Sequence, residues 1–166
     1  MKKIRNAKGF TLIEILVVIG IIAILAAIVI IAINPAKQFA QARNSQRTSN
    51  VNSILNAIGQ RMADNKGVFV GPYTVNAVTY TCPALPLAPA KAVDSGAAGA
   101  GVNLSCLVPT YIPALPNDPA WVAASGVDTL YDVVVDAAGR VTISAPNALT
   151  ETSVPDAATN PISVTR

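Results

Sequence analysis

This chain consists of one apolar block near its N-terminus and a more polar remainder in which apolar and polar positions follow regular patterns. Residues 10–33 (FTLIEILVVIGIIAILAAIVIIAI) form a nearly unbroken apolar stretch of 24 residues. At about 1.5 Å per residue, a helix of this length spans roughly 36 Å, enough to cross a bilayer. The stretch therefore predicts a transmembrane helix. Residues 1–9 (MKKIRNAKG) form a short basic leader ahead of it.

A helical pattern continues over residues 34–64. Apolar side chains recur at spacings of three and four residues, at Val51, Ile54, Leu55, Ile58 and Met62. This spacing gives a helix one apolar face, which we expect to dock on a sheet. Residues 43–50 (RNSQRTSN) contain no apolar side chain, so we expect Arg43 and Arg47 to lie on a solvated face.

Two positions mark the ends of this amphipathic helix. Pro35 follows Asn34 at the end of the apolar block, and a proline inside a helix removes a hydrogen bond and bends or interrupts it. Gly67 follows Asn65 and Lys66, where it suits the left-handed residue that closes many helices.

Residues 65–166 predict a small β-rich domain. Residues 68–82 are rich in β-branched and aromatic side chains and favour a strand or extended segment, whereas the Pro-, Ala- and Gly-rich residues 83–101 favour a long irregular loop. Apolar and polar positions alternate over residues 127–135 and 141–145, which predicts a hairpin with one buried face. The tail from Pro146 predicts extended or mobile chain. The fold class is α+β: a long N-terminal helix packed on a small antiparallel sheet.

The positive charge of the chain is concentrated in the leader. Of the twelve Lys and Arg residues, four lie before residue 9, and nine Asp and Glu residues oppose them, giving a net charge of +3. A cut after Gly9 leaves eight basic and nine acidic side chains, so the remaining chain carries −1. The charge pattern therefore gives no indication of nucleic-acid binding.

No constellation of catalytic residues is present. The chain has no histidine, which excludes histidine-based acid–base chemistry and most zinc sites. We therefore predict neither an enzyme nor a cofactor. Calcium could use the carboxylates of Asp128, Asp132 and Asp136, or Asn117 and Asp118 in the LPNDP segment, but these signals are weak and we assign no metal site. Asn103-Leu104-Ser105 matches the glycosylation sequon, which only a host with that machinery would use.

Cys82 and Cys106 are the only two cysteines. Basic residues before the apolar helix predict that the N-terminus stays in the cytoplasm and that the rest is translocated. Because an oxidising compartment favours disulfides and only one pairing exists, we expect a Cys82–Cys106 bridge.

Glu14 is the only charged residue between Gly9 and Asn34. The apolar stretch alone would predict a signal anchor, that is, a single permanent span. A carboxylate inside such a stretch is costly, however, by about 2.5–3.5 kcal/mol at the centre of a span and less near its ends. A free α-amino group at Phe10, created by a cut after Gly9, would be a suitable partner, particularly one from a neighbouring subunit.

The segment Gly9-Phe10-Thr11-Leu12-Ile13-Glu14, behind a basic leader and before an apolar helix, closely resembles the processing site of type IV prepilins and pseudopilins. The resemblance covers about residues 1 to 60. It implies that a prepilin peptidase cuts after Gly9 and that the new N-terminus, Phe10, is methylated. It also implies that Glu14 pairs with the α-amino group of the preceding subunit during assembly.

The resemblance implies a structural subunit of a pilus-like filament. Such a subunit waits in the cytoplasmic (inner) membrane with its N-terminus inside, and assembly machinery then polymerises it with its own copies into an extracellular filament. Two alternatives remain at this point. One is a pseudopilin of a type II secretion or DNA-uptake system, and the other is a membrane-anchored, single-span binding protein.

Overall fold

The computed structural model describes residues 9–154 and 161–166. The chain divides into two compact units, Met1–Gln38 and Phe39–Arg166, and each is described by itself. The leader residues 1–8 lie outside the described part of the chain.

Helix α1 (Leu12–Ile33) is the described helix of the first unit, and none of its residues is buried. Thr11 is its N-cap, and Asn34 closes it in the left-handed conformation at φ 47°. Asn tolerates this conformation better than most residues because its short side chain can bond locally. The apolar block therefore forms a helix as predicted, beginning two residues later than the apolar stretch.

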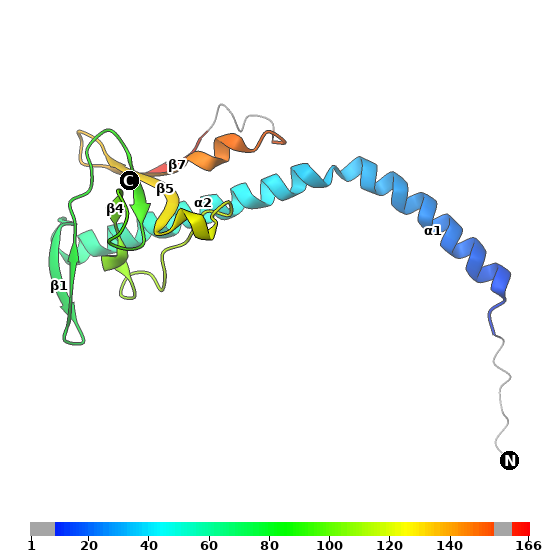
Figure 1. The fold of residues 1–166 in the computed structure, drawn as a ribbon, viewed down its shortest axis with the longest axis horizontal. Helices are drawn as coiled ribbons and strands as arrows, with labels where there is room; N and C mark the ends of the chain where they lie inside the picture. The colour runs from blue at the N-terminus through cyan, green and yellow to red at the C-terminus, as the bar shows by residue number, and fades with distance from the viewer. Residues whose placement is uncertain (1–8, 155–160) are drawn as a thin grey trace, which may run out of the picture. The chain divides into compact units, whose positions relative to one another are not determined.

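Helix α2 (Pro35–Asp64) begins directly after this break (Figure 1). Pro35 occupies its first turn, where the missing N–H would have no helical partner anyway. The Asn34 side chain accepts the backbone N–H of Lys37 at 3.4 Å and so helps to start the helix. At the other end Gly67 adopts φ 88° and donates its N–H to the carbonyl of Met62, which confirms the predicted stop.

The strands form two sheets. A hairpin of β1 (Gly71–Val75) and β2 (Val78–Cys82) makes the smaller sheet, and Asn76 and Ala77 in its turn both have positive φ. The larger sheet has the order β4-β3-β5-β6-β7. Its strands are β3 (Lys91–Asp94), β4 (Val102–Asn103), β5 (Asp128–Val135), β6 (Val141–Ala145) and β7 (Ile162–Thr165). All neighbours are antiparallel except β3 and β4, so the α+β prediction is confirmed.

Three short 3-10 helices complete the described elements: η1 (Ser105–Leu107), η2 (Ala123–Ser125) and η3 (Pro146–Thr150). Two sequence-based expectations need correction here. The segment 83–101 contains strand β3, which pairs with β5, and is therefore not wholly irregular. The tail contains η3 and ends in β7, which pairs with β6 over Thr142 to Ala145. Pairing with β5 fixes β3, whose sequence KAVD has a weak β propensity, whereas the β-branched residues of β7 (ISVT) favour a strand and pair with the free edge of β6.

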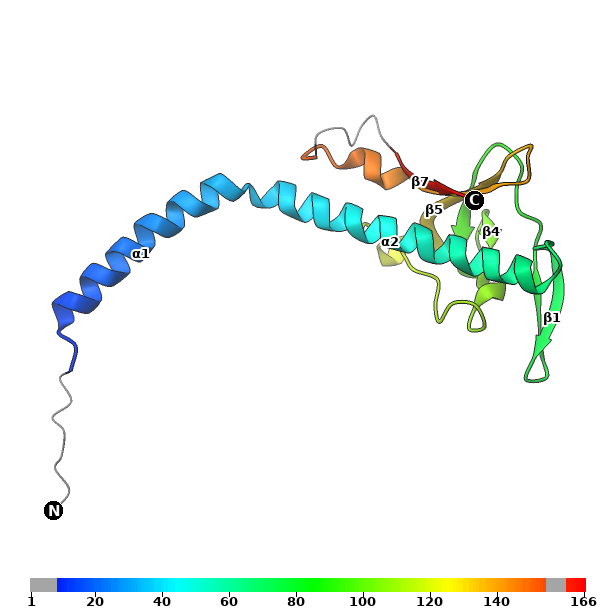
Figure 2. The ribbon, with the colours of Figure 1, turned by 180° about the vertical axis from the view of Figure 1, so that it is seen from behind.

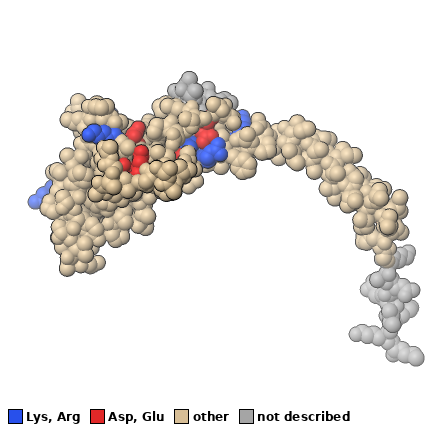
Figure 3. Space-filling view, viewed as in Figure 1, with Lys and Arg blue, Asp and Glu red and all other residues tan. Residues whose placement is uncertain are grey.

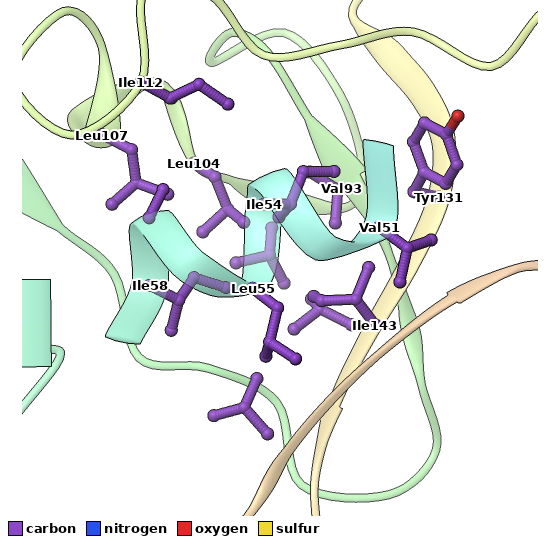
Figure 4. Packing of buried hydrophobic residues seen from close by; sticks show 14 of the residues in the cluster. Val51, Ile54, Leu55, Ile58, Val93, Leu104, Leu107, Ile112, Tyr131 and Ile143 are labelled. Atoms are coloured by element: carbon purple, nitrogen blue, oxygen red, sulfur yellow. The ribbon is translucent and has the colours of Figure 1, made fainter. Parts of the chain in front are cut away.

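The C-terminal half of α2 covers one face of the larger sheet. It passes behind the strands in Figure 1 and in front of them in Figure 2, which is turned by 180°. The predicted stripe is buried: Val51, Ile54, Leu55 and Ile58 are at most 2% exposed, and Met62 packs against the same core. Figure 4 shows Val51, Ile54 and Leu55 on the side of Val93, Tyr131 and Ile143, and Ile58 on the side of Leu104 and Leu107. The predicted docking of the helix stripe on the hairpin is therefore confirmed.

Candidate assembly site

The segment from Gly9 to Glu14 begins as irregular, exposed chain and becomes helical at Leu12. Gly9 and Phe10 lie before the helix, and the Phe10 side chain is 84% exposed. Gly9 and Phe10 are exposed and lie outside the helix, so a peptidase could bind the bond between them without first opening α1.

Glu14 and Thr11 form a reciprocal cap at the start of α1. The Thr11 hydroxyl accepts the backbone N–H of Glu14 at 3.3 Å. One carboxylate oxygen of Glu14, Oε2, accepts both the backbone N–H and the hydroxyl of Thr11 at 2.8 Å. This capping box satisfies two of the N–H groups that a helix start leaves free, and it holds the Glu14 carboxylate beside the segment that precedes the helix.

The remainder of α1 is apolar on every side. The most apolar 18-residue window of α1 has a mean hydropathy of 3.5, and none of its residues is buried in the protein. Figure 3 shows no acidic or basic side chain on the visible face of this helix. A helix of this length and composition can cross a bilayer, and outside lipid it requires a partner surface that is equally apolar.

The cysteines are joined within the second unit. Cys82, at the end of β2, is disulfide-bonded to Cys106 in η1, with 5.3 Å between their Cα atoms. Both residues are buried, and the hydroxyl of Tyr73 donates to the carbonyl of Cys106 beside them. The bridge therefore closes the segment that carries β3 and β4.

The expectation that Arg43 and Arg47 lie on a solvated face is wrong for Arg47 and only half right for Arg43. Arg47 is 1% exposed and donates to both carboxylate oxygens of Asp118, at 2.7 and 3.1 Å. It also donates to Glu151 at 2.7 Å. Arg43 is less covered and forms a two-point pair with the same Glu151, at 2.7 and 2.5 Å. The polar stretch of α2 thus faces carboxylates brought in from distant loops.

These contacts shift the acid–base equilibria of the cluster. The hydrogen bonds from Arg43, followed by those from Arg47, lower the pKa of Glu151 to about 2 despite its burial. Burial acts to lower the pKa of Arg47, but its bonds to Asp118 and Glu151 outweigh this effect and raise it. Burial also raises the pKa of the nearby Tyr131 hydroxyl to about 12. Arg43, Arg47 and Glu151 are therefore ionised near neutral pH.

The candidate calcium ligands are used in other ways. Asp118 is held by Arg47, and Asp136 caps the β5–β6 turn and pairs with Arg140 at 2.7 Å. Asp128 and Asp132 lie on β5, where burial and the neighbouring Asp128 raise the pKa of Asp132. Within residues 9–154 and 161–166, no group of three or more His, Cys, Asp or Glu side chains is placed to hold a metal ion.

Comparison with known proteins places this arrangement in a family. The family model described as "Prokaryotic N-terminal methylation motif" matches residues 4–32. The chain is also 35% identical over 121 residues to the "Type IV wide pilus major component PilA4" of Thermus thermophilus. The aligned stretch covers 73% of this chain and 83% of that protein. The chain belongs to the type IV pilin family. No solved structure matches it significantly.

The family assignment does not depend on the N-terminal motif alone. An aligned stretch of 121 residues is much longer than the first unit of this pilin, so the similarity to PilA4 reaches into the second unit. The resemblance inferred from Gly9 to Glu14 is confirmed at the level of the family. The buried contacts of Arg47 with Asp118 and Glu151 are the feature that the sequence did not indicate, since both carboxylates lie far along the chain.

Proposed function

We propose that this chain is the structural subunit of a type IV pilus-like extracellular filament, which is cut after Gly9 and polymerises through its N-terminal helix. The observation that carries the proposal is the fully exposed, 22-residue apolar helix α1, whose one carboxylate is held at its very start. Such a surface is stable in lipid before assembly and in a bundle of identical helices afterwards. The proposed role is structural and not catalytic.

The proposed division of the chain follows from this cycle. Residues 1–9 are the leader, residues 10–33 the membrane and filament-core helix, residues 34–64 its amphipathic continuation, and residues 65–166 the exported domain. Basic residues in the leader favour a precursor with its N-terminus in the cytoplasm. The buried disulfide suits an oxidising compartment on the other side of the membrane. The partners are a prepilin peptidase, the assembly machinery and further copies of the chain.

Glu14 has the geometry to pair with a neighbouring subunit. Its Oε2 atom accepts both bonds from Thr11, and the described residues supply no partner for Oε1. In a helix bundle that excludes water, an unpaired carboxylate oxygen is costly, whereas an ammonium group beside it offsets the cost. The α-amino group of Phe10 from a second copy can supply that charge. A methyl group on this amine retains the charge and leaves two N–H donors.

The comparisons favour a pilus subunit over the alternatives. The similar protein in Thermus thermophilus is described as a major component of a wide pilus, and the similarity extends over most of both chains. A pseudopilin of a secretion or DNA-uptake system would use the same processing and assembly chemistry but would form only a short filament. A permanently anchored binding protein would use Glu14 only as the cap of α1 and would need no ammonium group from a second copy.

The first test combines shearing with mass spectrometry. We expect sheared extracellular filaments to contain this chain with Phe10 at its N-terminus and one added methyl group. An intact leader, found only in the membrane fraction, would contradict both processing and polymerisation. Filament length in electron micrographs separates a pilus subunit from a pseudopilin.

The second test separates the charge of Glu14 from its role in capping. Glu14→Gln keeps an acceptor for Thr11, because glutamine also forms the capping box, but it removes the charge. Glu14→Ala removes both. We expect both variants to be cut after Gly9, as judged from the N-terminal peptide in membranes, and neither to enter sheared filaments. Normal assembly of Glu14→Gln would refute the ion pair and leave only the cap.

A further inference from the structure

Helix α2 is attached to the rest of the second unit in two different ways along its length. Its C-terminal half, residues 51–64, buries Val51, Ile54, Leu55 and Ile58 in the core. In residues 39–50 the buried side chains are Ala40 and Arg47, while the large apolar side chain of Phe39 is 66% exposed. The N-terminal half therefore contributes little apolar burial.

Polar contacts hold this N-terminal half instead. We call them the polar seam, defined by Arg43, Asn44, Arg47 and Asn50 on α2 and by Asn117, Asp118, Tyr131 and Glu151 opposite them. The α2 residues recur at helical spacing and so share one face. Figure 3 shows basic and acidic side chains gathered over this part of α2.

Each member of the polar seam has a geometrically matched partner. Arg47 uses all three guanidinium nitrogens, because it also donates to the Asn44 side chain at 2.7 Å. Asn50 donates to the hydroxyl of Tyr131 at 2.8 Å and to the carbonyl of Asn117 at 3.2 Å. Two arginines face two carboxylates, so the charges balance. The seam therefore fixes the register of α2 through directional bonds.

The two kinds of attachment respond differently to separation. Pulling the apolar stripe away from the sheet would expose large hydrophobic side chains to water, which is strongly unfavourable. Apart from the small side chain of Ala40 and part of Tyr131, separating the polar seam would expose groups that water solvates well, and the solvation they regain offsets much of the lost attraction. The N-terminal half can therefore open by itself, whereas the C-terminal half opens only with the core.

We propose that residues 39–50 of α2 are a releasable segment: they separate from the globular domain at the polar seam while residues 51–64 stay docked. The matched bonds also let the segment return to the same register. The release itself does not require polymerisation, but its use in a filament rests on the proposed function. There, tension along the helix would reach the seam before the core, and the domain would remain folded.

The size of the change can be estimated from chain geometry. Twelve helical residues span about 18 Å, and the same residues fully extended reach about 40 Å. A released segment that unwinds therefore lengthens each subunit by about 20 Å. It does so without exposing an apolar core.

Hydrogen exchange on the full-length protein in detergent micelles tests the release directly. We expect amides in residues 39–50 to exchange about 100-fold faster than those in residues 51–64, through an opening that low denaturant does not accelerate. Exchange of both halves together, as one unit, would overturn the proposal. Because micelles contain no filaments, failure here is distinct from failure of the proposed function, which the sheared-filament experiment reports.

Two variants and a control make the test specific to the polar seam. Arg43→Ala removes a half-exposed member and should accelerate exchange in residues 39–50 alone. Combining Arg47→Leu, Asp118→Leu and Glu151→Leu replaces the ionic centre with apolar contacts. This variant should slow amide exchange in residues 39–50 toward the exchange rate of residues 51–64. Arg140→Ala removes an exposed ion pair of the β5–β6 turn and should change neither rate. Equal rates in wild type and both seam variants would refute the role of the seam.

Discussion

Replacing Arg47 with methionine tests the energetics of the buried ionic cluster. Methionine fills much of the same space, so the main loss is the charge and its hydrogen bonds. Asp118, whose side chain is 0% exposed, would retain the backbone N–H of Ala120 at 2.8 Å but no cation. Glu151 would keep its two-point pair with Arg43. The cost of Arg47→Met therefore falls mainly on one buried, uncompensated carboxylate.

The expected magnitude follows from the burial of each partner. Removing one member of a buried ion pair typically costs about 3–5 kcal/mol of unfolding free energy, and we expect Arg47→Met to lie in this range. The Arg43 side chain is 42% exposed, and Glu151 would keep Arg47, so Arg43→Ala should cost about 1 kcal/mol or less. In Arg47→Met with Asp118→Leu, no charge is buried alone, and most of the lost stability should return.

Urea unfolding of the full-length protein in micelles measures these differences. Trp121 is the only tryptophan, and its backbone N–H donates to the carbonyl of Asp118 at 2.8 Å, so its fluorescence reports on the affected loop. A cost of Arg47→Met no greater than that of Arg43→Ala would contradict a penalty from the stranded Asp118 carboxylate. A further loss of stability on adding Asp118→Leu would also contradict it, because removing that carboxylate should remove the penalty.

Three further outcomes are expected from the same unfolding assay. Cys82→Ser should destabilise the second unit by about 3 kcal/mol, because the bridge closes a loop with a sequence separation of 24, and reductant should have the same effect on the wild type. An added methyl group meets no other atom within 4 Å at either Gly67 or Gly59, so backbone conformation decides the effect of each alanine. Gly67→Ala should cost about 1–2 kcal/mol because Gly67 has φ 88°. Gly59→Ala inside α2 should stabilise the protein by about 0.5–1 kcal/mol. Ionised Glu151 should contribute about 3 kcal/mol to the free energy of unfolding above pH 4.5. This contribution should fall as the pH decreases toward the folded pKa of Glu151, about 2.

Each of these expectations has a clear contrary result. Unchanged stability of Cys82→Ser would mean that the loop is held by its other contacts. If Gly67→Ala and Gly59→Ala changed the free energy of unfolding in the same direction, backbone conformation would not explain their effects. For Glu151 the sign is fixed by the lowered folded pKa: protonation is easier in the unfolded chain, so acid must destabilise. A Glu151→Gln variant should lose this part of the pH dependence, and an unchanged profile would refute the assignment.

Features that depend on neighbours along the chain could be predicted from the sequence. The apolar block, the 3.6-residue stripe of α2 and the two-residue alternation of β5 and β6 each report the environment of one element from its own periodicity. The stop at Gly67 follows from the ability of glycine to adopt positive φ. The candidate site from Gly9 to Glu14 is equally local, since its meaning lies in residue types at fixed short spacing.

Features that depend on distant partners were decided only by the tertiary structure. The polar residues of α2 look the same in the sequence whether they face water or carboxylates. Arg47 meets Asp118 and Glu151 across separations of 71 and 104 residues, and no periodicity encodes such a pairing. Strand β3 likewise exists because β5 offers it an edge, not because of its own composition, and the place of β7 beside β6 is a long-range pairing that the local sequence does not specify. Local patterns thus set the helices, the hairpin and the segment from Gly9 to Glu14, while long-range pairing decided which polar groups are buried.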